Sequence, residues 1–322
     1  MEYNIYDSSM EAEWDAFVEV QSLNGTILHT RNFYNHNPKN AEDEHSFVFM
    51  KKDKIIALLP AVLYKKEGKR ILHSHLRATY GGFIVSAQTG VAEAIEIVNV
   101  LITYCKKLEV SEIVIRNPFR IFNKQFTDET DYGMWYHGFT IKSREIETAI
   151  ALGDYDTVRI SYSDTTVRNV KKSMRYISVG ESTAYKEYWD ILEQNLIRKY
   201  GVHPTHSYEQ FQVLINNVGN DKIKLFVAET DNQMVGGIII FIANDITLHA
   251  QYIASNENYQ EYRPLNALID CIIKWGCENG YKYLNLGTSN SDAGREINSG
   301  LFRFKEGFGG RGVLRETMHL VL

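Results

Sequence analysis

The 322-residue chain is poor in cysteine and has no long apolar run. Its three cysteines, Cys105, Cys271 and Cys277, are odd in number and form no CxxC pair, which argues against a disulfide framework or a zinc site. The longest apolar runs, such as 234–243, are much shorter than a membrane span. The N-terminus, MEYNIYDSSMEAEW, lacks the basic-then-apolar order of a signal peptide. We therefore expect a soluble, cytoplasmic protein.

Several catalytic signatures are also missing. The chain contains no G-x-S-x-G motif, Walker loop, H-E-x-x-H motif or dinucleotide fingerprint. A formal net charge of -5 argues against a protein whose whole surface binds nucleic acid, but it leaves a local basic cleft open. The length exceeds that of a usual single domain, which favours two domains.

What the sequence does contain is a repeated pattern. Two apolar hairpins with polar turns are expected at 46–64 (SFVFMKKDKIIALLPAVLY) and 223–243 (IKLFVAETDNQMVGGIIIFIA). Each is followed by a third strand-like segment, a helical pattern and a further strand, so each half reads β-β-β-α-β. These later segments are 79–85, 90–109 and 112–116 in the first half, and 246–255, 264–278 and 281–287 in the second. The pattern predicts two similar domains, 1–155 and 156–322.

The helix expected over 264–278 carries the clearest signals. Pro264 suits the first helical position, and Gly280 suits the C-terminal stop. Apolar residues recur on one face at helical spacing: Leu265, Leu268, Ile269, Ile272 and Ile273. A helix between two adjacent strands is a crossover, so we expect the flanking strands in each half to be parallel neighbours.

Five stretches carry a resemblance to a known family: EWDAFVEV (13–20), ATYGGFIV (78–85), VRNVKKSMRYISV (167–179), YKYLNLGT (281–288) and GLFRFKEGFGG (300–310). With the duplicated pattern, they make the whole chain resemble the FemAB-type transferases, which are tandem GNAT acyltransferases. The resemblance implies an α/β (α+β) fold of two tandem GNAT-like domains, each a mixed, mostly antiparallel sheet flanked by helices. It also implies that the second domain carries the chemistry.

The resemblance implies transfer of an acyl group from an activated donor to an amine by a bacterial enzyme. Peptidoglycan-bridge members use an aminoacyl-tRNA donor and a cell-wall precursor, whereas other relatives use acyl-CoA and the amine of a small molecule or amino sugar. The long coiled arm of some tRNA-dependent members is missing, since the chain has no run of heptads. This favours acyl-CoA as co-substrate, with no tightly bound cofactor and no DNA partner. Aminoacyl-tRNA-dependent peptidyl transfer stays the alternative.

A non-catalytic binding or scaffold module is a third reading. GNAT enzymes hold the CoA pyrophosphate on a glycine-rich turn before a helix. Here the corresponding turn reads NYQEYRPLNAL, without glycine, and Pro264 removes one amide donor. FemAB-type proteins share this departure, so it supports the family and leaves the donor open.

Lys305, within GLFRFKEGFGG, is the first candidate catalytic residue. In the resembling family this segment approaches the transfer centre, where a lysine holds a donor phosphate or stabilises an oxyanion. Arg303 lies two residues away, and at strand spacing it would share the face of Lys305 and contact substrate. The plain alternative is a tight β-connection with both cations solvated and its phenylalanines in the core.

Tyr252 is the second candidate catalytic residue, because it lies in the strand expected at 246–255, beside the strand pair that GNAT folds splay apart. Its hydroxyl suits proton donation to a leaving group or a hydrogen bond to the acyl carbonyl. We expect the donor co-substrate to contact Gln251, Ile253 and Arg263. With 20 tyrosines in the chain, most are expected to be structural.

A cluster after the helix expected from about residue 185 is a candidate acceptor site. Arg198, Tyr200 and His203 resemble the arginine-bearing acceptor clamp of FemAB-type proteins, and arginine suits a bidentate hold on phosphate or carboxylate. His203 and His206 are separated by Pro204, which breaks a helical ligand pair and argues against a metal site.

A basic helical face follows the domain junction. Its cations recur at helical spacing: Arg168, Lys171, Lys172 and Arg175. Such a face suits tRNA phosphates, but a solvated helix surface fits it equally well.

Overall fold

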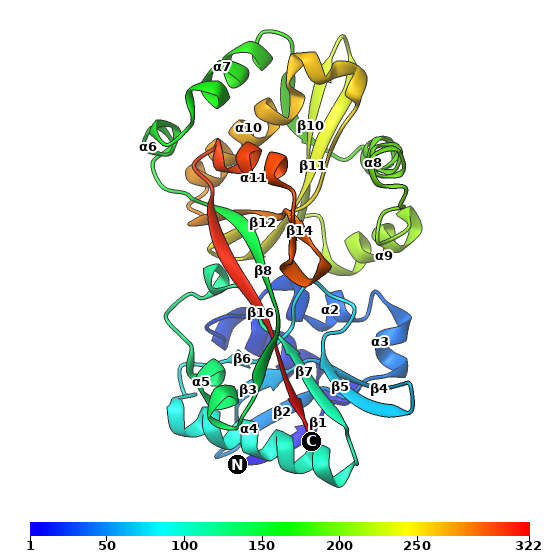
Figure 1. The fold of residues 1–322 in the computed structure, drawn as a ribbon, viewed down its shortest axis with the longest axis vertical. Coiled ribbons are helices and arrows are strands. Elements are labelled where there is room, and N and C mark those ends of the chain that lie inside the picture. The colour runs from blue at the N-terminus through cyan, green and yellow to red at the C-terminus, as the bar shows by residue number, and fades with distance from the viewer. The chain divides into compact units, whose positions relative to one another are not determined.

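The computed structural model describes the backbone of residues 1–322 and the side chains of all of them except Ala41, Glu42 and Tyr200. The chain forms two units, whose elements are labelled in Figure 1. Unit 1 comprises residues 1–146, 291–295 and 314–322, and unit 2 comprises residues 147–290 and 296–313. Unit 1 thus includes two short segments from the C-terminal part of the chain. The domain limits 1–155 and 156–322 stay a prediction.

Two long strands contribute residues to both units, β8 (Thr140–Ala151) and β16 (Arg311–Val321). The other strands of unit 1 are β1 (Glu2–Ile5), β2 (Phe47–Lys51), β3 (Lys54–Leu59), β4 (Ala61–Lys66), β5 (Lys69–Ser74), β6 (Ile84–Val85) and β7 (Glu112–Arg116). Its helices are η1 (Ser8–Met10), α1 (Glu11–Ala16), η2 (Phe17–Gln21), η3 (Ile27–His29), α2 (Arg31–Tyr34), α3 (Pro38–Glu42), α4 (Val91–Lys107), η4 (Arg120–Phe122), α5 (Glu129–Tyr136) and η6 (Asp292–Gly294).

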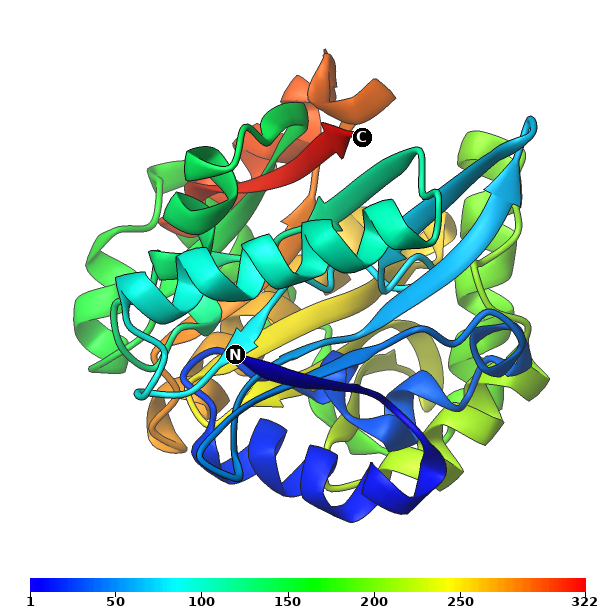
Figure 2. The same ribbon diagram turned by 90° about the horizontal axis from the view of Figure 1, so that it is seen from below.

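Unit 1 contains strands in the order β1-β2-β3-β6 and strands in the order β4-β5-β7-β16. Helix α4 packs its apolar stripe on both sets of strands, and together they form one core. Figure 2 shows the helix lying across the strands. The core includes Phe47, Leu72, Leu101, Ile113 and Met318. The helix predicted at 90–109 and the strand predicted at 112–116 are therefore present.

One prediction for the first half is wrong. The segment 55–64 is not a single strand, because Pro60 separates β3 from β4 and cannot donate to a sheet ladder. The resulting extra hairpin, β4–β5, supplies the parallel neighbour of β7, which is β5. Strand β6, the expected neighbour, instead pairs antiparallel with β3.

Both predicted hairpin turns are confirmed and share one conformation. Lys52 and Asp53 have φ values of 51° and 57°, and Asp231 and Asn232 have values of 49° and 58°. Two consecutive left-handed residues form the turn whose twist matches that of antiparallel strands, and asparagine and aspartate tolerate it best.

The other strands of unit 2 are β9 (Ser178–Ser182), β10 (Ile223–Thr230), β11 (Gln233–Asn244), β12 (Thr247–Ser255), β13 (Tyr283–Thr288) and β15 (Glu296–Ile297), and β14 (Asn290–Ser291) pairs with β15. Its helices are α6 (Tyr155–Ile160), α7 (Asp164–Ser173), α8 (Tyr185–Tyr200), α9 (Tyr208–Val218), η5 (Glu257–Tyr262), α10 (Pro264–Glu278) and α11 (Ser299–Glu306). The hydrogen-bonded order of its main strands is β8-β13-β12-β11-β10-β9.

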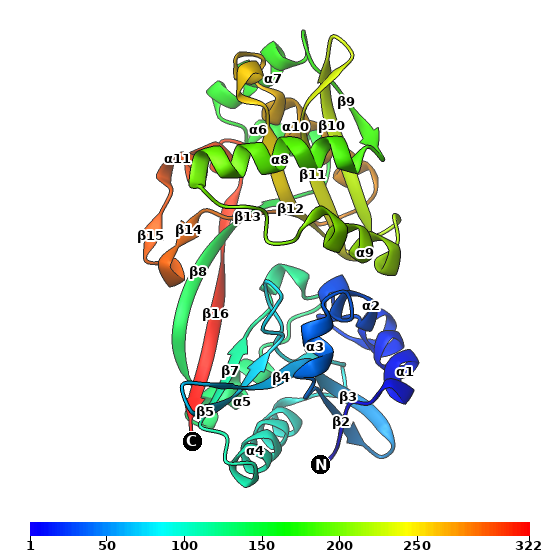
Figure 3. The ribbon, with the colours of Figure 1, turned by 90° about the vertical axis from the view of Figure 1, so that its right-hand side faces the viewer.

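The sheet of unit 2 is covered on both faces. Helix α10 buries the stripe predicted from the sequence against β10, β11 and β12, while α8 crosses the opposite face (Figure 3). Strands β12 and β13, on either side of α10, are parallel neighbours, which confirms the crossover predicted for the second half. No helix in the described part of the chain is long and apolar enough to cross a membrane.

Candidate functional site

The candidate site of unit 2 begins where β12 and β13 stop pairing. Their parallel pairing covers three residue pairs and ends at His249 and Asn285. Beyond it, β12 carries Gln251 as an extra residue opposite β11, and Gly287 takes a left-handed φ of 73° in β13. On its other edge β13 continues to pair with β8 as far as Thr288. The two strands therefore have unpaired edges toward each other at this point.

Residues 300–306 of the segment GLFRFKEGFGG lie in helix α11, and a turn follows. The alternative of a tight β-connection is therefore wrong. The side chain of Asn298 caps the helix by accepting a hydrogen bond from the Leu301 amide at 3.0 Å. In a helix, residues two apart point in different directions. Accordingly Lys305 is buried whereas Arg303 is exposed, so the prediction that they share a face is wrong.

Lys305 directs its ammonium group to the unpaired end of β13. Its Nζ donates to the carbonyl oxygens of Gly287 at 2.8 Å and Thr288 at 2.7 Å, and the side chain is only 3% exposed. Burial lowers the pKa of Lys305 to about 8, while Glu147 acts in the opposite direction. An ammonium group has three N–H donors, so one remains after these two bonds.

Two buried polar residues hold the backbone that Lys305 contacts. The Asn285 side chain donates to Glu147 Oε2 at 2.7 Å and accepts from the Gly287 amide at 2.9 Å. Both residues are at most 2% exposed. They therefore fix the left-handed turn at Gly287, whose carbonyl positions the ammonium group. The sequence analysis missed Glu147 and Asn285, because nothing in their spacing indicates that they meet.

Tyr252 lies in an aromatic cluster on the face of the sheet that α8 covers. Its ring contacts Trp189 at 5.2 Å and Phe211 at 6.1 Å between centroids. Its hydroxyl forms a 2.6 Å hydrogen bond with His206 Nδ1. Burial raises the pKa of the Tyr252 hydroxyl, which stays protonated at neutral pH.

The structure does not bring the two candidate catalytic residues into contact. Lys305 belongs to α11, whose Phe304 packs against the core on the α10 face, whereas Tyr252 faces α8. Among the predicted donor contacts, Gln251 is the extra residue of β12 and Ile253 packs toward the α10 core. Arg263 is exposed, with a left-handed φ of 59° directly before α10.

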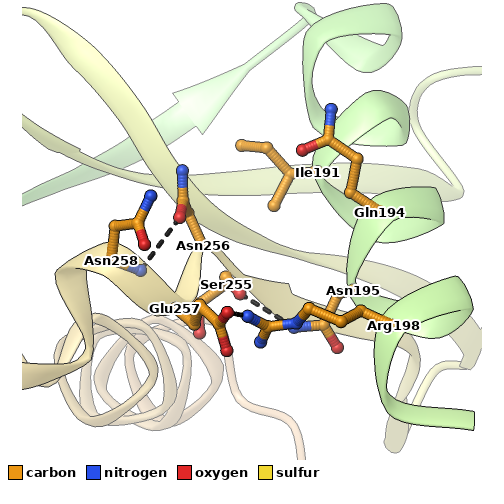
Figure 4. Close-up of a pocket in the computed structure, with 8 residues that line it drawn as sticks. All are labelled: Ile191, Gln194, Asn195, Arg198, Ser255, Asn256, Glu257 and Asn258. Atoms are coloured by element: carbon orange, nitrogen blue, oxygen red, sulfur yellow. Dashed lines mark hydrogen bonds and ion pairs between the residues drawn. The ribbon is translucent and has the colours of Figure 1, made fainter.

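A cavity of about 210 Å³ lies between α8 and the end of β12. Arg198 reaches across it from α8 and forms an ion pair with Glu257 (Figure 4). Beside them, the Asn195 amide donates to the Ser255 carbonyl oxygen at 2.9 Å. The polar lining suits a polar ligand, but neither Lys305 nor Tyr252 lines this cavity.

The predicted acceptor cluster is only partly assembled. Arg198 lines the cavity, whereas His203 is exposed and contacts Glu193 at 2.8 Å. Tyr200 ends α8, and its side chain lies outside the described residues. The basic face predicted near α7 is exposed at all four of its cations. Within the described residues, no group of three or more histidine, cysteine or acidic side chains suits a metal ion.

The start of α10 offers few donors for an anion. Pro264 has no N–H, and the amides of Asn266 and Ala267 donate to the Arg263 carbonyl oxygen. No side chain caps the helix. The arrangement therefore differs from a helix N-terminus that holds a pyrophosphate with free amides.

Comparison with known proteins agrees with this architecture. Residues 174–305 match the family model described as an acetyltransferase (GNAT) domain, and no curated protein matches the chain significantly. The crystal structure of FemX, 13% identical, superposes with a TM-score of 0.74 over 100% of this chain and 98% of that one. L-PGS from Bacillus licheniformis, 14% identical, has a TM-score of 0.60 over 97% and 91% of the two chains.

A conserved protein of unknown function from Bacteroides thetaiotaomicron is also similar. It is 9% identical and has a TM-score of 0.61 over 100% of both chains. These comparisons confirm the predicted FemAB-type fold of tandem GNAT-like domains. The domain match also confirms the predicted enzyme class at its coarse level, that of an acyltransferase.

Proposed function

We propose that this chain, which has a FemAB-type tandem GNAT-like fold, is an N-acyltransferase that moves an acyl group from an activated donor to the amine of a small molecule or amino sugar. The proposed reaction occurs in unit 2, where β12 and β13 separate. The observation that carries the proposal is the buried ammonium group of Lys305, which contacts two backbone carbonyls at this opening and has one donor left over.

In the proposed mechanism the acceptor amine attacks the donor carbonyl carbon directly. The new C–N bond forms as the carbonyl oxygen becomes an oxyanion, and the third N–H of Lys305 donates to that oxygen. The tetrahedral intermediate then collapses and the bond to the leaving sulfur or oxygen breaks, while the leaving atom takes a proton from Tyr252. The nitrogen passes its own proton to solvent, and Tyr252 regains a proton from solvent, so that the protons balance. One well-placed donor of this kind contributes roughly 3 kcal/mol to transition-state stabilisation.

We assign Tyr252 the role of proton donor to the leaving group. Its raised pKa keeps the proton on the hydroxyl until a basic leaving group forms. The hydrogen bond to His206 orients this hydroxyl. Because Tyr252 and Lys305 lie on opposite faces of the sheet, the donor has to span the opening between β12 and β13 for both residues to act on it.

Acyl-CoA is the donor that we propose to test first, with Gln251, Ile253 and Arg263 as its contacts. Aminoacyl-tRNA is the second candidate, and the start of α10 favours it, because Pro264 and the bonded amides leave little to hold a pyrophosphate. In that case the reaction is peptidyl transfer to a cell-wall precursor, and the exposed cations near α7 are candidate contacts for tRNA phosphates. In either case the Arg198 cluster is the proposed acceptor site.

The test offers acetyl-CoA or alanyl-tRNA to the full chain, with and without a panel of amino sugars, and measures donor consumption. We expect consumption only when an amine is present, and a loss of about 100-fold or more in kcat for Lys305→Met. Arg303→Met is the matched control, because it removes an exposed cation from the same helix and should retain activity. Full activity of Lys305→Met would remove this lysine from the mechanism.

A further inference from the structure

A second polar cavity lies entirely within unit 1, on the face of strands β4, β5, β7 and β16 that α4 does not cover. Side chains alternate along these strands, so Leu72, Ile113 and Met318 enter the core under α4 while their neighbours point the other way. The opposite face is a groove of about 700 Å³. Its lining includes Tyr64, Lys66, His73, Glu112, Arg116 and Lys142.

The carboxylates of this groove already have cationic partners. Glu112 pairs with Lys142 at 2.5 Å and contacts His319 at 2.8 Å. Glu145 pairs with Arg315 at 2.6 Å. These contacts neutralise much of the negative charge of the lining, apart from the exposed Glu67 in the β4–β5 turn.

Arg116 is a half-buried cation of the groove without such a partner. Its guanidinium donates to the Ala78 carbonyl oxygen at 3.0 Å, and it forms no ion pair with any described residue. Burial and the neighbouring Arg315 both lower the pKa of Arg116, although a guanidinium remains charged in proteins. Its four remaining N–H donors are therefore available for a bidentate contact with an anion.

Two uncharged groups stand beside Arg116. Tyr64 and His73 line the same groove as Arg116, and the Tyr64 hydroxyl has no hydrogen bond to a described residue. Burial raises the pKa of Tyr64, which the charge of Arg116 acts to lower. His73 Nδ1 lies 2.9 Å from the Ser74 carbonyl oxygen, which only accepts, so Nδ1 carries the proton. Burial lowers the pKa of His73 to about 4, which leaves Nε2 as a neutral acceptor at physiological pH.

The groove thus combines a fork of N–H donors, a hydroxyl and a neutral acceptor. We propose that it binds a small anionic molecule that also carries a hydroxyl group, with its phosphate or carboxylate on Arg116 and its hydroxyl directed to His73. Lys66 and Lys69, exposed and without ion pairs to described residues, add attraction at the rim. This site goes beyond the proposed acyl transfer, which takes place in unit 2.

The test titrates glycerol 3-phosphate, glycerate and uncharged glycerol into the ¹⁵N-labelled full chain and follows the Arg116 Nε–H signal by NMR. We expect at least one of the two acids to bind with a dissociation constant in the millimolar range or below, and glycerol not to bind. Tighter binding of glycerol 3-phosphate identifies a phosphate site, and tighter binding of glycerate identifies a carboxylate site.

Two matched variants separate a built site from general attraction. Arg116→Gln and Lys142→Gln each remove one positive charge from the same groove, but Lys142 is already paired with Glu112. We expect Arg116→Gln to weaken binding at least tenfold and Lys142→Gln less than twofold, with folding of both checked by thermal unfolding. Equal losses in the two variants, unchanged binding by Arg116→Gln, or no binding of either acid to the wild type would overturn the proposal.

Discussion

Arg31 in unit 1 and Lys305 in unit 2 are both almost fully buried cations, and the two units satisfy them in opposite ways. Arg31 in unit 1 is 2% exposed and pairs with the Glu44 carboxylate. Its guanidinium carbon also lies 3.6 Å from the ring centre of Tyr6 and 4.2 Å from that of Tyr34. Lys305 in unit 2 is 3% exposed and has two carbonyl partners, but it forms no ion pair with a described residue. A direct ion pair and aromatic rings favour a structural role, whereas a buried cation that contacts backbone carbonyls beside unpaired strand edges favours a chemical one.

Replacing each cation with methionine is the strongest test of whether Arg31 is structural and Lys305 is not. We expect Arg31→Met to lower the free energy of unfolding by about 3 to 5 kcal/mol, because it leaves the Glu44 carboxylate without its partner in a buried setting. Lys305→Met should lower this free energy by less than Arg31→Met does, since it removes a charge that burial already penalises and leaves the Glu147 carboxylate hydrogen-bonded to Asn285. Chemical denaturation of both variants measures the difference. A larger loss for Lys305→Met would mean that its role is structural.

Acidic pH should weaken unit 1 through its buried histidines. Burial lowers the pKa of His29 to about 4 and that of His75 to about 3. The folded state therefore excludes protons that the unfolded chain binds below about pH 6.5, so stability is present above this pH and lost as the pH falls toward 4. We expect a loss of at least about 1 kcal/mol between pH 7 and 5. Denaturation curves that coincide at the two pH values would contradict this account.

The pH dependence of kcat tests whether Lys305 acts in its protonated form. Because the protonated form stabilises the oxyanion, kcat should fall as the pH rises through about 8. Glu147 raises the pKa of Lys305, so Glu147→Gln should move this descending limb to lower pH while leaving the hydrogen bond to Asn285 possible. A kcat that instead rises through pH 8 would identify the neutral amine as a base.

The smallest effect on stability is expected for the ion pair at the α8 cavity. Arg198 and Glu257 are both more than 40% exposed, and an exposed pair contributes less than about 1 kcal/mol. Arg198→Gln should therefore unfold like the wild type but raise KM for the acceptor. An unchanged KM for acceptor and donor would exclude this cavity from substrate binding.

Local signals account for most of what the sequence predicted correctly. Pro264 and Gly280 bracket α10 as expected, and the polar hairpin turns contain the residues that tolerate a left-handed backbone. The break between β3 and β4 at Pro60 carries a signal of the same kind. Each of these features depends on a few neighbouring residues, so periodicity and turn chemistry suffice to find it.

Helix α11 shows where a local pattern misleads. Its alternation of phenylalanine and cation has the period of a strand, and Gly300 weakens the helical pattern. The side chain of Asn298, which caps the helix, was the signal that could have identified it. The positions of Glu147 and Asn285 depend on the pairing of β8 with β13, and no local pattern in a single sequence reveals that contact.

The position of β16 in the sheet determines which part of the fold can be completed first during translation. His319 contacts Glu112, 207 positions earlier in the chain, and residues 317–321 form the ladder with β7. Translation proceeds from the N-terminus, so β7 has to wait for this partner until the whole of unit 2 has been made. The part of the protein that is synthesised first is therefore the part that is completed last, and nascent chains stalled before residue 314 should expose an unprotected edge of β7.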